Sequence, residues 1–364
     1  MSGRFDQRRD RLRRLMRKQG LPALLVTHTG NVRYLTGFTG DDSYLLLLPQ
    51  TDVLLSDPRF TTQLEEECPG LQCEIRAPGT SILDALQQCF RTGKSSILGV
   101  EGASLTLVTY EAIKSRLESI DLVSTSGLVE QLRLIKDREE VAHLREAVSI
   151  AQRSFGVIRA SLQSQDTEKE VADLLEYQIR QFGGTQSAFE PIVAVGPRAA
   201  LPHARPTSCQ IGEADFVLVD WGAVSGGYRS DLTRILVTGK ISRKLERIYE
   251  IVLKAQQRAI KAIRPGVTLN KVDRSARSVI AKAGFEKNFG HGLGHGIGLE
   301  IHEAPRLAPK QTQTLQPGMV VTVEPGIYLP GWGGIRIEDD VLVTRTGHEV
   351  LSDLERSLGG SIVA

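Results

Sequence analysis

Long apolar runs and paired cysteines are both missing from this chain of 364 residues. No apolar stretch approaches the ~18–20 residues that a membrane helix needs, so we expect no membrane-spanning segment. The basic N-terminus has no apolar core behind it, which is not typical of a secretory signal. The absence of any C-x-x-C pair leaves a thiolate metal cluster or a disulfide framework without support and favours incidental thiols in a reducing cytoplasm. The four cysteines are Cys68, Cys73, Cys89 and Cys209.

An excess of one charge is missing too, because the net charge is only +2. The segment RFDQRRDRLRRLMRKQ near the N-terminus is nevertheless basic, and it permits two interpretations. One is a nucleic-acid-binding arm, and the other is the solvated face of an amphipathic helix. We favour the helix because apolar residues recur at helical spacing, namely Phe5, Leu12, Leu15 and Met16. We therefore predict no nucleic-acid partner.

The length exceeds that of one ordinary core, which favours two domains, and the composition is that of a soluble globular protein. Residues 1–127 alternate short apolar strand patterns with helical patterns, which predicts an α/β domain. Strands are expected at LPALLVT, YLLLLP, DVLLSD and SSILGVE, and helices at SILDALQQCF and TYEAIKSRLESI.

Residues 128–364 follow a different plan. Capping boxes at Asp137–Glu140 and Thr167–Glu170 each predict the start of a helix, and strand-like runs follow. Two further helices, over about 243–263 and 270–283, precede the runs MVVTVEP and IRIEDDVLV. The order of two helices followed by an acid-rich hairpin thus occurs twice in this part of the chain. We predict a pseudo-symmetric α+β domain with its site between the halves.

Each predicted hairpin carries a pair of acids. Asp220 and Asp231 are centred on the turn residues Ser225-Gly226-Gly227, so without a bulge they would face each other with Cβ atoms ~5 Å apart. Glu324 and Glu338 are centred on residue 331, again within a turn signal. Like charges in such positions repel, and a bound cation would remove the repulsion. Arg336 shares a strand face with Glu338 and can reach the same site.

Three of the seven histidines lie in the segment HGLGHGIGLEIHE, at positions 291, 295 and 302. Its glycines make a single helical face improbable for His291 and His295, and the helical HExxH zinc motif is absent because position 306 is arginine. One histidine with four carboxylates is a mixed-donor set that suits Mn, Co, Fe or Zn better than a thiolate-selected metal. Two divalent cations ~3.5–4 Å apart would balance the four charges.

These motifs together resemble the pita-bread metallopeptidases, and most closely the Xaa-Pro aminopeptidases and Xaa-Pro dipeptidases (prolidases). The resemblance rests on LPHARPT, DWGAVSGGYRSDLTR, HGLGHGIGLEIHE, TVEPGIY and GGIRIED. NVRYLTGFTG and SDPRF resemble the creatinase-type N-terminal domain of the same enzymes. The likeness implies a creatinase-type domain over 1–127 and a pita-bread catalytic domain over 128–364.

The resemblance also implies a role for each metal ligand. Asp220 would chelate one metal and His295 would bind the other, with Asp231 and Glu338 bridging the two. Glu324 would complete the set and act as the catalytic proton shuttle beside the nucleophilic water.

Other residues match positions of the family that face the substrate. His203 and His302 would steady the scissile carbonyl and its developing oxyanion as catalytic and substrate-binding residues. His291 and Arg336 would order the carboxylates or meet the substrate. Phe189 and Tyr228 can line the proline pocket, although as isolated aromatics we expect both in the core.

The function implied is hydrolysis of an Xaa-Pro bond by metal-bound hydroxide, with two Mn²⁺ or Co²⁺ ions expected and Zn²⁺ or Fe²⁺ as alternatives. The substrate is the N-terminus of a peptide or an Xaa-Pro dipeptide, and the sequence leaves that choice open. A methionine aminopeptidase would usually lack the first domain, a creatinase would lack the metals, and a pseudo-enzyme serving as an interaction module would have lost ligands. Members of the family usually form dimers or tetramers, and we expect a homodimer.

Overall fold

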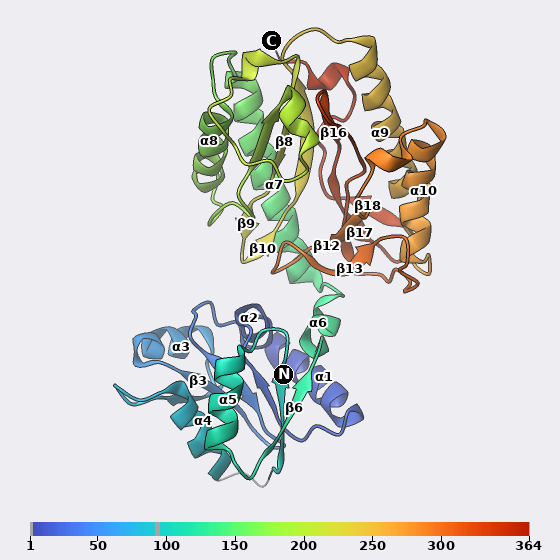
Figure 1. Ribbon diagram of the computed structural model, residues 1–364. Coiled ribbons are helices and arrows are strands. Elements are labelled where there is room, and N and C mark those ends of the chain that lie inside the picture. The colour runs from blue at the N-terminus through green and yellow to red at the C-terminus, as the bar shows by residue number, and fades with distance from the viewer. Residues whose placement is uncertain (1–2, 92–94, 364) are drawn as a thin grey trace. The chain divides into compact units, whose positions relative to one another are not determined.

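The computed structural model describes residues 3–91 and 95–363. The chain divides into two compact units, Met1–Arg133 and Leu134–Ala364 (Figure 1). The domain boundary after residue 127 stays a prediction, because compactness in space does not identify the segments that fold independently. Within the described ranges, none of the helices combines the length and the apolar character that a membrane span requires.

The first unit alternates strands and helices, as its sequence predicts. Its strands are β1 (Leu24–Val26), β2 (Tyr44–Leu47), β3 (Asp52–Ser56), β4 (Gln72–Ile75), β5 (Ile97–Glu101) and β6 (Asp121–Thr125). Its helices are α1 (Arg4–Lys18), α2 (Thr29–Thr36), α3 (Thr61–Glu67), α4 (Ile82–Arg91), α5 (Leu107–Arg116) and α6 (Leu128–Arg133). The strands form one sheet in the order β4-β3-β2-β1-β5-β6, in which β2 runs antiparallel to both neighbours and the other pairs are parallel.

Helix α1 confirms the amphipathic interpretation of the basic segment. Leu12 and Met16 are buried against the unit. Two of the arginines are also used internally, because Arg9 and Arg13 both pair with Asp52, at 2.9 and 2.6 Å. Part of the basic character therefore anchors the helix rather than facing solvent.

The second unit contains two helix pairs and several antiparallel sheets. The helices are α7 (Arg138–Ser161), α8 (Glu168–Gln181), α9 (Arg243–Ala262) and α10 (Leu269–Lys282), and both predicted capping boxes are present at α7 and α8. One three-stranded sheet has the order β11-β8-β7, formed by β7 (Ile192–Val195), β8 (Phe216–Trp221) and β11 (Leu232–Val237). Beside it lies the short ladder of β9 (Val224–Ser225) and β10 (Tyr228–Arg229).

The second half of this unit holds a five-stranded sheet in the order β13-β12-β14-β17-β18 and the ladder β15-β16. The strands are β12 (Gly294–Gly296), β13 (Glu303–Leu307), β14 (Val320–Val323), β15 (Gly326–Leu329), β16 (Gly333–Arg336), β17 (Asp339–Val343) and β18 (His348–Val350). Short 3-10 helices in the two units are η1 (Pro58–Phe60), η2 (Gly196–Ala200), η3 (Ile211–Glu213), η4 (Glu286–Asn288) and η5 (Gly359–Ser361).

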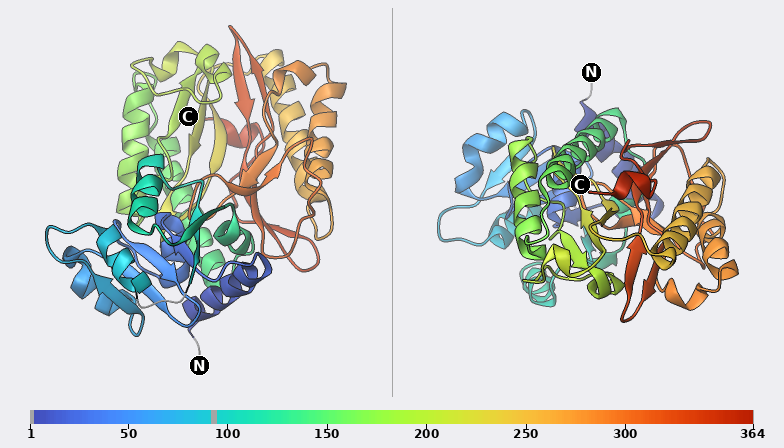
Figure 2. Two further views of the ribbon diagram at one scale, coloured as in Figure 1. Left: turned by 60° about the horizontal axis from the view of Figure 1, so that its bottom comes forward. Right: turned by 90° about the horizontal axis from the view of Figure 1, so that it is seen from above.

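The sheets of the second unit are covered on both sides. Helices α7 and α8 lie along one outer side and α9 and α10 along the other (Figures 1 and 2). Strand β8 is apolar from Phe216 to Val219 because both of its faces are covered. Val217 and Val219 belong to the core that includes α7 and α8, whereas Phe216 and Leu218 belong to the core that includes α9 and α10. The same alternation places Asp220 on the side of Phe216 and Leu218, toward the second half.

The first acidic hairpin departs from its predicted register. Asp220 pairs with Thr233 rather than with Asp231. Ser225 pairs with Tyr228, so the turn consists of Gly226 and Gly227, which have φ angles of +56° and +87°. Two successive residues of positive φ form a tight turn that glycine adopts without strain. The centre of this turn lies one residue later than expected, which shifts the strand pairing by two residues. The two aspartates are therefore diagonal neighbours.

The second acidic hairpin has the predicted register. Leu329 pairs with Gly333 in the ladder β15-β16, and Val323 pairs with Asp339 in the ladder β14-β17. The two ladders continue one another, so Glu324 and Glu338 lie opposite each other between them. The expectation that the turn is centred on residue 331 is confirmed.

Candidate metal centre

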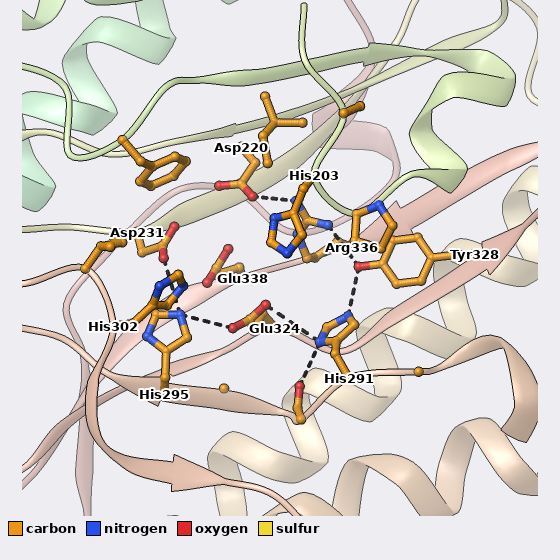
Figure 3. Close-up of a pocket in the computed structure, with 18 of the residues that line it drawn as sticks. His203, Asp220, Asp231, His291, His295, His302, Glu324, Tyr328, Arg336 and Glu338 are labelled. Carbon is orange, nitrogen blue, oxygen red and sulfur yellow. Dashed lines mark hydrogen bonds and ion pairs between the residues drawn. The ribbon is translucent and has the colours of Figure 1, made fainter. Parts of the chain in front are cut away.

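The five predicted metal ligands lie on the wall of one cavity in the second unit, which has a volume of about 920 Å³ (Figure 3). They come from separate segments of both halves. Asp220 lies near the end of β8, Asp231 directly before β11, His295 in β12, Glu324 directly after β14 and Glu338 between β16 and β17. The hairpins and the glycine-rich segment therefore converge, as the pseudo-symmetric plan predicts.

Three of the five residues form the tightest cluster. One ligand atom from each of Asp231, His295 and Glu338 lies within 4.8 Å of the others. Nε2 of His295 is 3.3 Å from Oε1 of Glu324 and 3.6 Å from Oδ2 of Asp231. Such spacing between donor atoms leaves room for an ion to be held by several of them at once.

Burial of the acids makes an uncompensated site unfavourable. Burial and the nearby carboxylates of Glu338 and Asp220 hold the pKa of Asp231 far above its ordinary range. Burial likewise raises the pKa of Glu324 to about 8 and that of Glu338 well above its ordinary value. Burial lowers the pKa of His295 to about 4, so its imidazole is neutral at pH 7 and can serve as a ligand. Each negative carboxylate disfavours ionisation of its neighbours, and a bound cation would stabilise their ionised forms.

Unpaired oxygen atoms supply a direct test of whether metals fit. Oδ1 of Asp220 and Oε1 of Glu338 are buried and have no hydrogen-bond partner among the described residues. Buried polar atoms are almost always paired, so an orphaned atom calls for an explanation. Carboxylate oxygens are good ligands for divalent ions such as Mn²⁺. The residues present therefore fit a divalent metal centre.

A chain of hydrogen bonds joins the acids to Arg336. Nη2 of Arg336 forms an ion pair with Asp220, and its Nε donates to the Thr233 hydroxyl at 3.1 Å. Nη1 donates to the Tyr328 hydroxyl at 2.9 Å, which is 3.0 Å from Nε2 of His291 (Figure 3). Burial lowers the pKa of His291 to about 4, so this ring is neutral at pH 7.

Thr233 and Tyr328 are site residues that our sequence reasoning missed. Strand periodicity carried the signal for both. Thr233 is two positions after Asp231, and Tyr328 is four positions after Glu324, so each shares a strand face with a predicted ligand. A third missed residue, Asp340, accepts a hydrogen bond from the backbone amide of Asp231 at 3.0 Å.

Two other histidines line the cavity at its more exposed side. His203 lies in the loop that follows η2, and His302 lies in the turn before β13. The His302 ring meets the His295 ring edge-on, with centroids 4.5 Å apart. Burial, and next the nearby Arg306, lower the pKa of His302.

The two aromatic residues separate in the structure. Phe189 is half-buried and lines the cavity, so our expectation of a core position for it is wrong. Tyr228 is a core residue, as expected. Its hydroxyl donates to Glu140 at 3.0 Å, and its ring stacks on that of His143.

Glycine allows the strand that carries His295 to pack closely. A Cβ atom on Gly294 would lie 2.1 Å from the carbonyl oxygen of Thr322, and one on Gly296 would lie 2.1 Å from that of Ala304. Neither backbone neighbour can move easily, so no larger residue fits. Residues 294–296 form strand β12, so the expectation that His291 and His295 do not share a helical face is confirmed.

Comparisons with known proteins agree with this architecture. The profile of metallopeptidase family M24 matches residues 142–345, and that of the creatinase/prolidase N-terminal domain matches residues 8–135. An uncharacterized peptidase of Bacillus subtilis is 38% identical over 349 residues, which are 96% of this chain and 98% of that protein.

Two solved structures are similar over nearly the whole chain. An Xaa-Pro dipeptidase from Bacillus anthracis is 40% identical, with a TM-score of 0.94, and the match covers 97% of this chain and 99% of that one. An X-Pro aminopeptidase from Thermotoga maritima is 35% identical, with a TM-score of 0.89, and the match covers 96% of this chain and 99% of that one. The predicted fold class, an α/β N-terminal domain with a pita-bread catalytic domain, is confirmed. The chain belongs to metallopeptidase family M24.

Proposed function

We propose that this protein is a dinuclear-metal exopeptidase that hydrolyses the bond between an N-terminal residue and a following proline. The observation that carries the proposal is the convergence of three buried carboxylates, the partly buried carboxylate of Glu324 and one neutral imidazole in a single cavity. Two of the carboxylate oxygens have no hydrogen-bond partner among the described residues. Membership of a metallopeptidase family and the names of the similar proteins support both the metal dependence and the Xaa-Pro bond.

The proposed ligands are those expected from the sequence. Asp220 and His295 would each bind one ion, Asp231 and Glu338 would bridge them, and Glu324 would complete the set. Oxygen donors with one imidazole suit Mn²⁺ or Co²⁺, and we propose these over Zn²⁺ or Fe²⁺. When bound, a pair of such ions lowers the pKa of a water and polarises a carbonyl oxygen.

Glu324 is the residue that we assign to proton transfer. Oε1 of Glu324 accepts a hydrogen bond from the Thr322 hydroxyl at 3.1 Å, which leaves Oε2 to take a proton from the attacking water. The proline nitrogen of the substrate belongs to a tertiary amide and must gain a proton as the C–N bond breaks. Glu324 can deliver that proton, acting first as a base and then as an acid.

The remaining residues bind and orient. The imidazoles of His203 and His302 reach the cavity and would steady the scissile carbonyl and its developing negative charge. Arg336 holds Asp220 through their ion pair, and His291 and Arg336 both contact the Tyr328 hydroxyl. These contacts would keep the carboxylates in place during the reaction.

The alternative specificities are less well supported. The creatinase/prolidase N-terminal domain at residues 8–135 argues against a methionine aminopeptidase. Five donors in one cavity argue against a pseudo-enzyme that serves only as an interaction module. The resemblance to the family supports a homodimer, and native mass measurement tests it. The absence of any C-x-x-C pair supports a cytoplasmic location, and cell fractionation tests it.

The experiment removes the metal and restores it. We expect the chelated protein to be inactive and Mn²⁺ or Co²⁺ to restore hydrolysis of Ala-Pro, of Ala-Pro-Ala, or of both. Hydrolysis of the dipeptide alone identifies a dipeptidase, and hydrolysis of the tripeptide identifies an aminopeptidase. Ala-Ala and Ala-Ala-Ala are the matched controls for proline. Full activity after exhaustive chelation, with no metal detected by elemental analysis, would contradict the proposal.

A further inference from the structure

Glu168 is a completely buried acid outside the proposed metal site. It is the first residue of helix α8, and its exposed fraction is 0%. Its two carboxylate oxygens accept five hydrogen bonds from one segment, residues 195–207. The donors are the Val195 amide at 2.8 Å, Arg198 Nε at 2.9 Å to each oxygen, the Thr207 amide at 2.9 Å and the Thr207 hydroxyl at 2.7 Å.

The contacts of Glu168 close this segment into a loop. Val195 is the last residue of β7, and Thr207 lies twelve positions further along the chain. Burying a carboxylate is costly unless it is paired and hydrogen-bonded, and here all the donors come from the loop and its two ends. Arg198 adds a link across the loop, because its Nη2 donates to the carbonyl oxygen of Arg205 at 2.5 Å.

The loop forms part of the cavity wall. It carries His203, whose ring points into the cavity (Figure 3), and four neighbours that also line it, namely Ala200, Pro202, Ala204 and Arg205. Besides the short helix η2 the loop contains no regular structure. A loop without ladder hydrogen bonds depends on other contacts for its conformation.

The loop is held on its other side by strand β16. A Cβ atom on Gly334 would lie 2.0 Å from the carbonyl oxygen of Ala199, so the loop backbone packs directly on the strand. Strand β16 ends at Arg336, which contacts Asp220. The loop is therefore placed between the strand that carries Arg336 and the carboxylate of Glu168.

We propose that Glu168 is a positioning residue that sets the place of His203 in the cavity by closing the loop 195–207. Glu168 touches neither the proposed ligands nor the cavity, so it acts through the loop. The effect on catalysis rests on the proposed function, in which His203 steadies the substrate carbonyl. The effect of Glu168 on the conformation of the loop does not depend on the proposed function.

The principal variant is Glu168→Gln, which keeps the size of the side chain but removes its charge and turns one acceptor into a donor. Glu176→Gln is the matched control, because Glu176 is exposed on the same helix. In Glu168→Gln we expect faster amide hydrogen exchange confined to residues 195–207. We also expect a KM for Ala-Pro substrates raised about tenfold or more, since small displacements of a positioned group are costly in catalysis. Metal content should equal that of the wild type.

A double-mutant cycle tests whether Glu168 works through His203. If it does, Glu168→Gln lowers kcat/KM by less than about twofold in a His203→Ala background, whereas independent residues give additive effects. Additive effects, a loss of metal, or wild-type exchange and KM in a folded Glu168→Gln protein would each overturn the proposal. If Glu168→Gln does not fold, the same measurements are made on Thr207→Val, which removes only one hydroxyl donor. Wild-type exchange and KM in that variant would then also overturn it.

The exchange measurement separates this proposal from the proposed function. If the wild type does not hydrolyse Xaa-Pro bonds, the proposed function fails. Faster exchange in residues 195–207 of Glu168→Gln would still support the role of Glu168 in holding the loop. Unchanged exchange in that variant would overturn it.

Discussion

The Thr233 hydroxyl donates a 2.5 Å hydrogen bond to Oε2 of Glu338, although the two residues are 105 positions apart in the chain. The backbone amide of Glu338 donates in turn to the carbonyl oxygen of Thr233 at 3.2 Å. Thr233 is also the strand partner of Asp220. One buried threonine therefore connects the two acidic hairpins and orients the carboxylate of Glu338, a proposed bridging ligand.

Thr233→Val is expected to weaken metal binding without removing a ligand. Valine cannot donate to Glu338 or accept from Arg336, and loss of such an outer partner typically reduces metal affinity ~10–100-fold. Calorimetric titration of the metal-free protein with Mn²⁺ measures the change. Thr233→Ser retains the hydroxyl and should bind nearly as the wild type does. Equal affinity in the valine and serine variants would show that the hydrogen bond does not aim Glu338.

Gly294→Ala is expected to destabilise the strand that carries His295. The added methyl would lie 2.1 Å from the Thr322 carbonyl oxygen, and overpacking of this kind costs ~1–3 kcal/mol or more. The midpoint of thermal unfolding should fall, and the metal content should fall with it. Gly290→Ala is the matched control, because no atom of the described residues lies within 4 Å of a Cβ at that position. Equal midpoints in the two variants would contradict the close packing of β12.

Metal affinity is expected to rise with pH up to about 8. Burial raises the pKa of Glu324 to about 8 in the metal-free protein, so binding must displace a proton at lower pH. Titrations in buffers of different ionisation enthalpy measure that proton release directly. Affinity that is independent of pH between 6.5 and 8 would contradict a ligand role for a protonated Glu324.

The stability of the metal-free protein should fall as the pH rises from 6.5 to 8, whereas metal affinity should rise. The pKa of Glu324 is about 8 in the folded state and its ordinary value is 4.5, so its stabilisation is present below pH 4.5 and is lost as the pH rises through 8. His291, with a pKa of about 4 against an ordinary 6.5, destabilises the fold only as the pH falls below 6.5. Between pH 6.5 and 8 the thermal midpoint of the metal-free protein should therefore fall. A rising midpoint would be inconsistent with these shifts.

Asp231→Asn is expected to abolish binding of at least one metal ion while sparing the metal-free fold. The substitution removes a bridging carboxylate and also removes like-charge repulsion with Glu338 and Asp220. Elemental analysis should therefore find less metal, and the metal-free variant should unfold at no lower a temperature than the metal-free wild type. Asp353→Asn, at an exposed acid, serves as the control. Unchanged metal content would argue against the bridging role.

Local patterns in the sequence predicted the elements and the second hairpin well. The capping boxes at α7 and α8 and the centre of the Glu324–Glu338 hairpin were all correct. The first hairpin was placed two residues out of register because the pair Gly226-Gly227 forms the turn. Its aspartates nevertheless keep one face, since a shift of two residues preserves strand alternation.

The sequence alone was enough to single out candidate residues for the chemistry, because periodicity, turn signals and motif spacing are properties of short segments. It singled out four acids, several histidines and Arg336 as candidates. Tertiary structure decided which partners they meet. The contact of Thr233 with Glu338, the position of Tyr328 beside Arg336, and the loop held by Glu168 all join segments that are distant in the chain or on different strands. Such contacts depend on how hairpins and helices pack. Strand periodicity indicates the face on which a side chain lies, but it does not identify the partner that the side chain meets.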